Sequence, residues 1–216
     1  MSKRKNKLSL VDSFYLTEAA KKYYLLCIKE CGFKKNKREI LFSALKNINN
    51  VVFVKSKNKN PVLREAILFK EICKKARLEL TEPSTFYYYP DFKILKICPI
   101  DRGRIIGNLT INYEVVLKKG LLNIKKEIET YSAKDDFKAA LIIICEGIEI
   151  YLKRILIFLK TKYSDKKELI DLISIVPLYP ANTFKEALQS ILIINSLLWM
   201  SDLPLIGLGR LDEVLY

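Results

Sequence analysis

Residues 176–216 read VPLYPANTFKEALQSILIINSLLWMSDLPLIGLGRLDEVLY, and the interpretation of the fold starts from this stretch. A pair of prolines ends one helix, and Asn182 or Thr183 caps the next. Glu186 follows Thr183 at the spacing of a capping box, in which each side chain accepts a hydrogen bond from a backbone N–H. Apolar residues then recur at helical spacing to about Met200. The stretch therefore predicts a capped helix and then a proline–glycine turn into LGRLDEVLY.

The composition is that of a folded protein. At 216 residues and 25.1 kDa, the chain is long enough for one domain or for a large piece of a bigger one. Half of its residues are hydrophobic, so it can bury a core. Its five cysteines are scattered without a CxxC pair, and it has no histidine. These features predict reduced thiols in a cytoplasmic protein, no metal site and no imidazole catalysis.

Two apolar stretches raise the question of a membrane. The stretch 139–159 carries four charged residues, and 187–200 is too short to span a bilayer. The basic first residues are not followed by an apolar run, so we expect no signal peptide. Both stretches fit core helices of a large protein better, and we predict no membrane partner.

The net charge of +14 raises the question of nucleic-acid binding. The lysines are spread along the chain, however, with small clusters only at Lys3–Lys7 and Lys55–Lys59. No arginine-rich helix, aromatic RNA-binding motif or zinc-finger spacing accompanies them. We therefore expect a solvated surface that binds polyanions weakly at low salt, and no specific nucleic-acid partner.

Hydrophobic periodicity predicts a mainly α-helical chain with a few short strands. Residues 1–13 are expected to be a flexible basic N-terminus, and 14–216 one unit without an internal linker. Helices are predicted over about 17–31, 37–48, 61–80, 134–162, 165–175 and 183–200. A further helix is expected to begin near residue 113, with a buried apolar stripe that extends to 128. A strand is predicted at 51–55 and extended segments over 86–103.

Three local features leave alternatives open. Tyr87, Tyr88 and Tyr89 could stack on a ligand, although partly buried packing with solvated hydroxyls is the favoured interpretation. Gly120 interrupts an apolar stripe, either for close packing or as a helix break. The helix over 134–162 is apolar on several sides, which is typical of a helix buried between layers.

Three ordered blocks of the sequence resemble one known family. They are GNLTINYEVVLKKGLLNIKKEIE (107–129), DDFKAALIIICEGIEIYLKR (135–154) and the closing stretch from Val176. Their order and spacing are similar to those of the pyruvate formate-lyase-like glycyl radical enzymes. The segments FYLTEA and NPVLREAILFKEI fall where that family has its early helices, so the resemblance covers about 14–216.

The resemblance implies the N-terminal helical region and the start of a ten-stranded β/α barrel, in incomplete form. In such enzymes, often homodimers, a separate radical-SAM activase installs a glycyl radical, which generates a thiyl radical that attacks the substrate. Both radical motifs lie downstream of the GR-x-D segment, and none of the five cysteines matches the thiyl position. We therefore expect a fragment of a lyase or dehydratase without catalytic residues or a cofactor of its own. It would be inactive alone and would need the remainder of the enzyme or a complementary subunit.

The family positions also suggest site residues. Asn108 and Asn112 stand where dehydratases place a histidine and an aspartate that contact substrate. An asparagine can form hydrogen bonds but cannot titrate, so choline, glycerol and propanediol become weaker candidates for the substrate. Turn formation and helix capping are the competing interpretation of both residues. The remaining signature positions imply structural roles and are Gly107, Tyr113, Glu186, Gln189, Gly209, Arg210 and Asp212.

A second hypothesis is a stand-alone basic helical module that binds a partner protein or a polyanion. An independent small enzyme would need a base, nucleophile or metal constellation, which the sequence does not offer. The fragment hypothesis further predicts large exposed apolar surfaces along 139–159 and 187–200.

Overall fold

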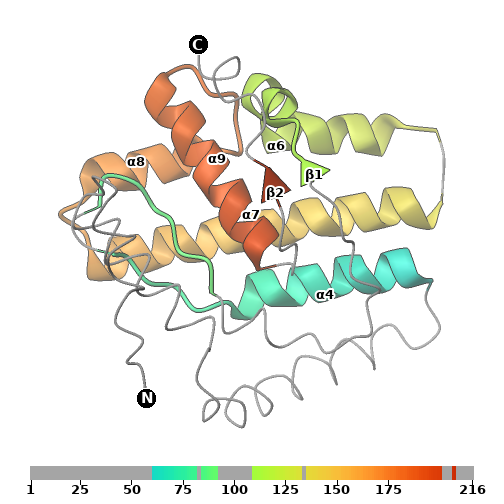
Figure 1. Ribbon diagram of the computed structural model, residues 1–216, viewed down its shortest axis with the longest axis horizontal. Helices are drawn as coiled ribbons and strands as arrows, with labels where there is room; N and C mark the ends of the chain where they lie inside the picture. The colour runs from blue at the N-terminus through green and yellow to red at the C-terminus, as the bar shows by residue number, and fades with distance from the viewer. Residues whose placement is uncertain (1–59, 82–83, 92–108, 133–134, 201–205, 208–216) are drawn as a thin grey trace, which may run out of the picture.

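The computed structural model describes residues 60–81, 84–91, 109–132, 135–200 and 206–207 (Figure 1). The predicted elements at 17–31, 37–48 and 51–55, the N-terminus 1–13 and most of 86–103 lie outside these ranges. The described elements are α4 (Pro61–Lys75), β1 (Leu109–Thr110), α6 (Tyr113–Thr130), α7 (Asp136–Lys162), α8 (Lys167–Ile175), α9 (Phe184–Trp199) and β2 (Ile206–Gly207). The predicted mainly helical chain with short strands is confirmed.

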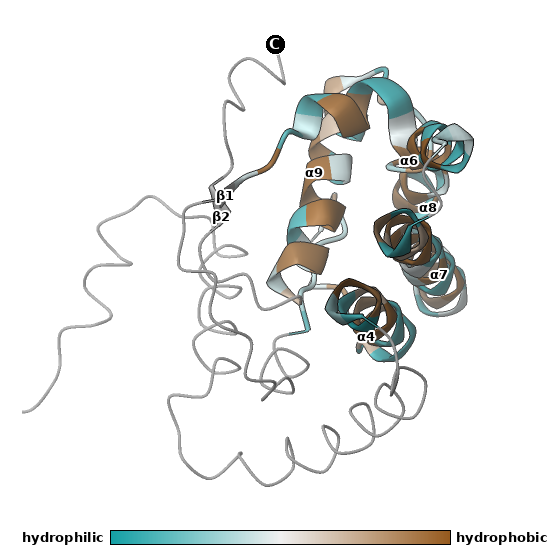
Figure 2. Cartoon of the chain, turned by 90° about the vertical axis from the view of Figure 1, so that its right-hand side faces the viewer, coloured by the Kyte–Doolittle hydropathy of each residue, from teal (hydrophilic) through white to brown (hydrophobic). Residues whose placement is uncertain are grey.

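The long helix α7 is the centre of the structure. Figure 2 views α4, α6, α7 and α8 nearly end-on as one layer, with α9 lying across one face. Asp135 caps α7 by accepting a hydrogen bond from the Lys138 N–H at 2.8 Å. Tyr151, Leu152 and Ile155 are completely buried in its middle. The helix is thus buried in part, but it lies within a layer and not between two layers as the sequence predicted.

Ion pairs join α7 to both of its neighbours. Glu146 pairs with Lys70 of α4, and Glu149 accepts a hydrogen bond from Lys125 of α6 at 2.7 Å. Within the residues that the structure describes, no helix combines the length and apolar composition needed to cross a bilayer.

Helix α4 begins as predicted but ends earlier. Its cap is Asn60, whose side chain accepts a hydrogen bond from the Val62 N–H at 2.7 Å. The sequence predicts a helix to about Leu80, whereas α4 ends at Lys75. The reason is a tertiary contact: the Arg154 guanidinium donates to the carbonyls of Cys73 at 2.7 Å and Ala76 at 2.6 Å. These bonds stabilise carbonyls that a helix end leaves unpaired.

Gly120 divides α6 into two parts, so that both interpretations of this glycine are correct. Its backbone (φ 71°, ψ 156°) lies in a region that is essentially restricted to glycine. The segment that joins α8 to α9 crosses the helix here: Leu121 N–H donates to the Pro177 carbonyl at 2.9 Å, and Ala181 N–H donates to the Leu117 carbonyl at 2.9 Å. The interrupted helix thus exchanges internal hydrogen bonds for bonds to the crossing segment.

The two short strands pair in parallel, with Leu109 opposite Ile206 and Thr110 opposite Gly207. Helices α6 to α9 form the connection between them (Figure 1). Parallel neighbours require a long crossover connection of this kind.

The prediction of large exposed apolar surfaces is mostly wrong for the two stretches it named. Of the large apolar side chains in 139–159, Ile157 is strongly exposed at 66%, and none in 187–200 is. The other strongly exposed ones are dispersed along the described chain: Val62, Val115, Tyr131, Phe137, Ile175, Tyr179 and Phe184. Helix α9 is covered because the 84–91 segment, α6 and α8 pack against it.

Candidate functional site

The turn between β1 and α6 carries the one family-position site residue that the structure describes. Asn112 occupies the N-cap position of α6 and is exposed, but its side chain makes no cap hydrogen bond. The helix start was predicted correctly, whereas capping by the Asn112 side chain is wrong. Asn112 follows the carboxyl end of β1 by two residues. Asn108 and Gly107 lie outside the described residues.

Tyr113 anchors the start of α6 to α9. Its side chain is almost completely buried and packs, together with Leu117, against Ala187 and Ile191. Burial raises the pKa of the Tyr113 hydroxyl, and the amide of Asn195 offsets part of this effect. The phenol is therefore neutral at physiological pH and serves as a packing residue beside the Asn112 turn.

The N-terminus of α9 has the predicted reciprocal cap. The Thr183 hydroxyl accepts from the Glu186 N–H at 3.2 Å, and the Glu186 carboxylate accepts from the Asn182 N–H at 2.6 Å. The signature residue Glu186 thus has a structural role.

Gln189, the next signature residue, is completely buried and binds backbone. Its Oε1 accepts from the Tyr87 N–H at 2.9 Å, and its Nε2 donates to the Tyr87 carbonyl at 2.9 Å. One side chain therefore satisfies both backbone groups of a residue more than a hundred positions away in the sequence. The sequence placed Gln189 in a family signature but offered no signal for this partner.

Two of the three tyrosines, Tyr87 and Tyr89, are part of the core, and Tyr88 is partly buried. Tyr87 and Tyr89 are buried, so solvated hydroxyls are wrong for them. The Tyr89 hydroxyl contacts the Arg77 guanidinium, and the Tyr88 hydroxyl donates to Asn195 Oδ1 at 2.8 Å. Tyr87 and Tyr89 are buried and Tyr88 between them is less so, and this period of two was the signal available in the sequence.

The two described cysteines are poor candidates for radical or nucleophilic chemistry. Cys73 and Cys145 are free and buried. Burial raises the pKa of Cys145 to about 11 and that of Cys73 still further. The described residues also hold no group of three or more Cys, Asp, Glu or His side chains that could bind a metal ion.

An open groove of about 330 Å³ lies between Ser84, Thr85 and the start of α8. Its walls include Asp165 and Glu168 as well as Lys166 and Lys167, so its charges largely cancel. None of the family-position residues lines it. The described arrangement can position β1, β2 and the Asn112 turn, and the charged groups of the groove are not among the family-position residues.

Comparisons with known proteins agree with the sequence resemblance. A family model described as pyruvate formate lyase-like matches residues 91–216. A glycyl radical enzyme from Archaeoglobus fulgidus has a similar structure, with a TM-score of 0.63 and 13% identity over 81% of this chain and 34% of that one. Comparison with curated proteins finds no match.

Two further solved structures share the fold. The B12-independent glycerol dehydratase from Clostridium butyricum gives a TM-score of 0.61 and 16% identity over 76% of this chain and 32% of that one. A structure that describes 1,2-propanediol dehydration in Roseburia inulinivorans gives a TM-score of 0.60 and 17% identity, over 80% of this chain and 33% of that one. The chain therefore spans about a third of the length of these structures. At such low identity the likeness establishes the fold and leaves the substrate open.

Proposed function

Because the chain belongs to the pyruvate formate lyase-like family, we propose that its 216 residues form the helical scaffold and first strands of a glycyl radical enzyme of the lyase or dehydratase type. Such an enzyme would break a C–C or C–X bond of a small molecule. The observation that carries the proposal is the parallel pairing of β1 with β2, because both strands lie inside the matched region and α6 to α9 form the crossover between them.

The Asn112 turn is the part of this scaffold that would contact substrate. Ligands of α/β proteins bind beyond the carboxyl ends of parallel strands, and Asn112 is exposed at that end of β1. Its amide can donate and accept a hydrogen bond without changing charge. A carbonyl or hydroxyl of a neutral substrate would fit such a group, and Asn108 is proposed to act beside it.

The radical chemistry would be supplied from outside these residues. Cys73 and Cys145 are buried and protonated, and the family's thiyl cysteine and glycyl radical match no position of the 216 residues. We therefore propose that the chain is inactive alone and acts with the remainder of the enzyme or a complementary subunit. The reduced thiols fit a cytoplasmic location, and an oxygen-sensitive radical fits anaerobic metabolism.

The test is anaerobic incubation of the purified 216-residue chain with a radical-SAM activase of the family, followed by electron paramagnetic resonance. We expect neither a glycyl radical doublet nor conversion of glycerol or 1,2-propanediol. The Clostridium butyricum glycerol dehydratase with its activase is the positive control. A glycyl radical doublet from the 216-residue chain, or substrate turnover by it, would contradict the proposal that the radical chemistry is supplied from outside these residues.

A second candidate function rests on the distribution of charge. Residues 1–59 contain 15 Lys and Arg against 4 Asp and Glu, whereas residues 60–216 contain 23 against 20. A short segment thus carries most of the net charge of +14. This asymmetry favours a polyanion-binding role of the N-terminal segment, either beside the enzyme function or in its place.

A further inference from the structure

The segment Ser84–Asp91 crosses the helical layer without regular secondary structure. Several hydrogen bonds join it to the described helices and their flanking residues through side chains. They connect Tyr87 to Gln189, Tyr88 to Asn195, Tyr89 to Arg77 and Tyr151, and Asp91 to the Arg77 N–H. A segment held in this way lacks the ladder of backbone bonds that a helix carries, so side-chain contacts determine whether it stays closed.

Gln189 makes the central contact of the segment. It is the side chain that satisfies both the N–H and the carbonyl of one residue, and both atoms are shielded from water. Buried backbone groups left without a partner cost more than an ordinary hydrogen bond contributes. Losing the Gln189 amide therefore favours exposure of Tyr87 to water.

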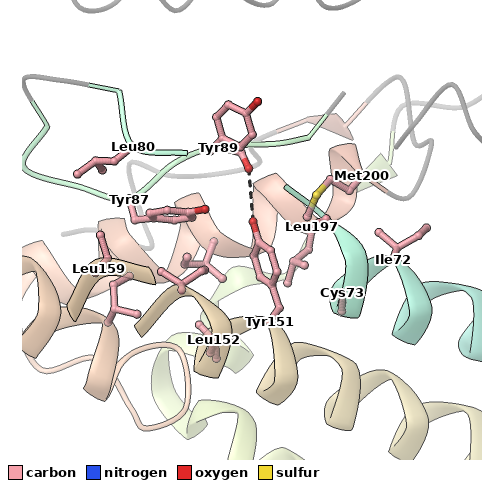
Figure 3. Packing of buried hydrophobic residues seen from close by; sticks show 14 of the residues in the cluster. Ile72, Cys73, Leu80, Tyr87, Tyr89, Tyr151, Leu152, Leu159, Leu197 and Met200 are labelled. Carbon is pink, nitrogen blue, oxygen red and sulfur yellow. Dashed lines mark hydrogen bonds between the residues drawn. The ribbon is translucent and has the colours of Figure 1, made fainter. Parts of the chain in front are cut away.

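Tyr87 and Tyr89 are the two residues through which the segment closes the core. Figure 3 shows the Tyr87 ring above Leu159 of α7, whereas the Tyr89 ring lies on the far side of the segment from Tyr151, whose hydroxyl donates to the Tyr89 carbonyl. Both residues belong to the same buried cluster, so movement of the backbone between them would withdraw both from it. Their departure would uncover the apolar face of α7 at Tyr151, Leu152 and Leu159.

We propose that residues 84–91 are a strap that opens as one unit while the helices stay folded, with Gln189 as its latch. This inference concerns the conformational behaviour of the fold and goes beyond the proposed enzymatic role. Opening would convert the buried α7 face into a temporary apolar surface next to the point where the family-matched region begins.

Native-state proteolysis with chymotrypsin tests the proposal, because the strap contains Phe86, Tyr87 and Tyr88 as cleavage sites. Cleavage is assigned by mass spectrometry, which separates these sites from those elsewhere in the chain. Gln189→Met keeps the side-chain length and removes both hydrogen bonds. We expect it to raise the cleavage rate in the strap on the order of tenfold to thirtyfold.

Ser190→Ala is the matched control. Ser190 is the buried neighbour of Gln189, but its hydroxyl bonds to the Glu186 carbonyl within α9. We expect strap cleavage in this variant to match that of the parent chain. The latch role of Gln189 would be contradicted if both substitutions raised the cleavage rate in the strap equally. It would also be contradicted if Gln189→Met raised the cleavage rate after Tyr151 as much as that in the strap.

The unsubstituted chain provides a second test that does not depend on how Gln189→Met folds. Opening of a small segment exposes less surface than global unfolding, so its rate depends less on urea. We expect cleavage in the strap to increase less steeply with low urea concentrations than cleavage after Tyr151. Identical urea dependence at both sites would mean that the strap opens only when the whole structure unfolds.

Discussion

Gly120 shows how one residue can join two parts of the fold. A Cβ atom at this position would lie 2.5 Å from the Tyr179 carbonyl carbon and 2.7 Å from the Leu178 carbonyl oxygen. Both obstacles are backbone atoms of the crossing segment, and that segment is fixed by hydrogen bonds to Leu121 and Leu122. Neither the conformation nor the space at Gly120 therefore admits another residue.

Gly120→Ala should consequently lower the free energy of unfolding by about 3 kcal/mol, from backbone strain together with overpacking. Urea denaturation followed by circular dichroism measures the loss. Lys126→Ala, an exposed change in the same helix, is the control and should stay within about 0.5 kcal/mol of the parent. A Gly120→Ala variant as stable as this control would contradict the crossing described here.

The buried thiols and phenols make the protein sensitive to alkaline pH. Burial raises the pKa of Cys145 from 9.0 to about 11, and burial and the neighbouring Tyr87 raise the pKa of Tyr151. Well below pH 9 these groups are protonated in both the folded and the unfolded chain, so the pKa shifts have no effect on stability. As pH rises from 9 to 11, the unfolded chain releases its protons first and the folded state loses stability.

We expect Cys145 to account for about 2 kcal/mol of this loss. The measurement is urea denaturation at pH 8, 9, 10 and 11 for the parent chain and for Cys145→Ala. The variant should be less stable at pH 8 but should lose less stability between pH 9 and 11. Parallel pH profiles would show that the thiol ionises as freely in the folded state as in the unfolded one.

At the scale of elements, most helix bounds follow from local sequence, whereas the end of α4 does not. Three of the described helices begin with a side-chain cap, at Asn60, Asp135 and Thr183. Each cap accepts a hydrogen bond from a backbone N–H only two or three residues further along the chain, so the local sequence was sufficient to locate these helix starts. The end of α4 depends on Arg154, which lies about eighty residues later. Helix α8 begins at Lys167, two residues after the Asp165 start that the sequence predicted.

The same distinction between local and long-range determinants applies to the candidate site. The sequence located the turn that carries Asn112 and the start of α6 at Tyr113, because both depend on nearby residues. The pairing of Gln189 with Tyr87 and the burial of the tyrosine segment depend on how α7 and α9 pack together. Such contacts between distant residues leave no pattern in a single sequence.

Arg154 gives an element-scale prediction. Arg154→Met retains much of the side-chain volume but leaves the Cys73 and Ala76 carbonyls without their donors, so we expect a loss of about 2 kcal/mol. Amide hydrogen exchange should also become faster in the last turn of α4. The neighbouring substitution Lys153→Met changes an exposed residue and should have little effect on either measurement. Unchanged exchange in α4 would show that Arg154 does not hold its end.

At the scale of the molecule, the described helices use many of their lysines internally. Lys118, Lys119 and Lys185 each bind a glutamate at 2.6 to 2.7 Å, as does Lys125. The N-terminal 59 residues have few acidic partners for their 15 basic side chains. Weak polyanion binding should therefore depend mainly on that segment.

The test replaces four basic residues of the N-terminal segment by glutamine: Lys3, Arg4, Lys5 and Lys7. We expect weaker heparin binding and a smaller salt dependence of that binding. The slope of log K against log salt concentration should decrease in magnitude by roughly 2 to 4. Fluorescence anisotropy with labelled heparin at several salt concentrations gives the slope. The control neutralises four lysines of α7 and α8: Lys153, Lys160, Lys162 and Lys167. A larger effect in the control would place the polyanion surface on the helices.

The parallel pair of β1 and β2 has a consequence for how the protein reaches its structure. Leu109 and Ile206 are almost a hundred residues apart, and the pair contains only two residues in each strand. So short a ladder cannot offset the chain entropy lost in closing so long a loop. The strands are therefore expected to meet late in folding, after α6 to α9 have packed, and refolding should be limited by this non-local contact order rather than by helix formation.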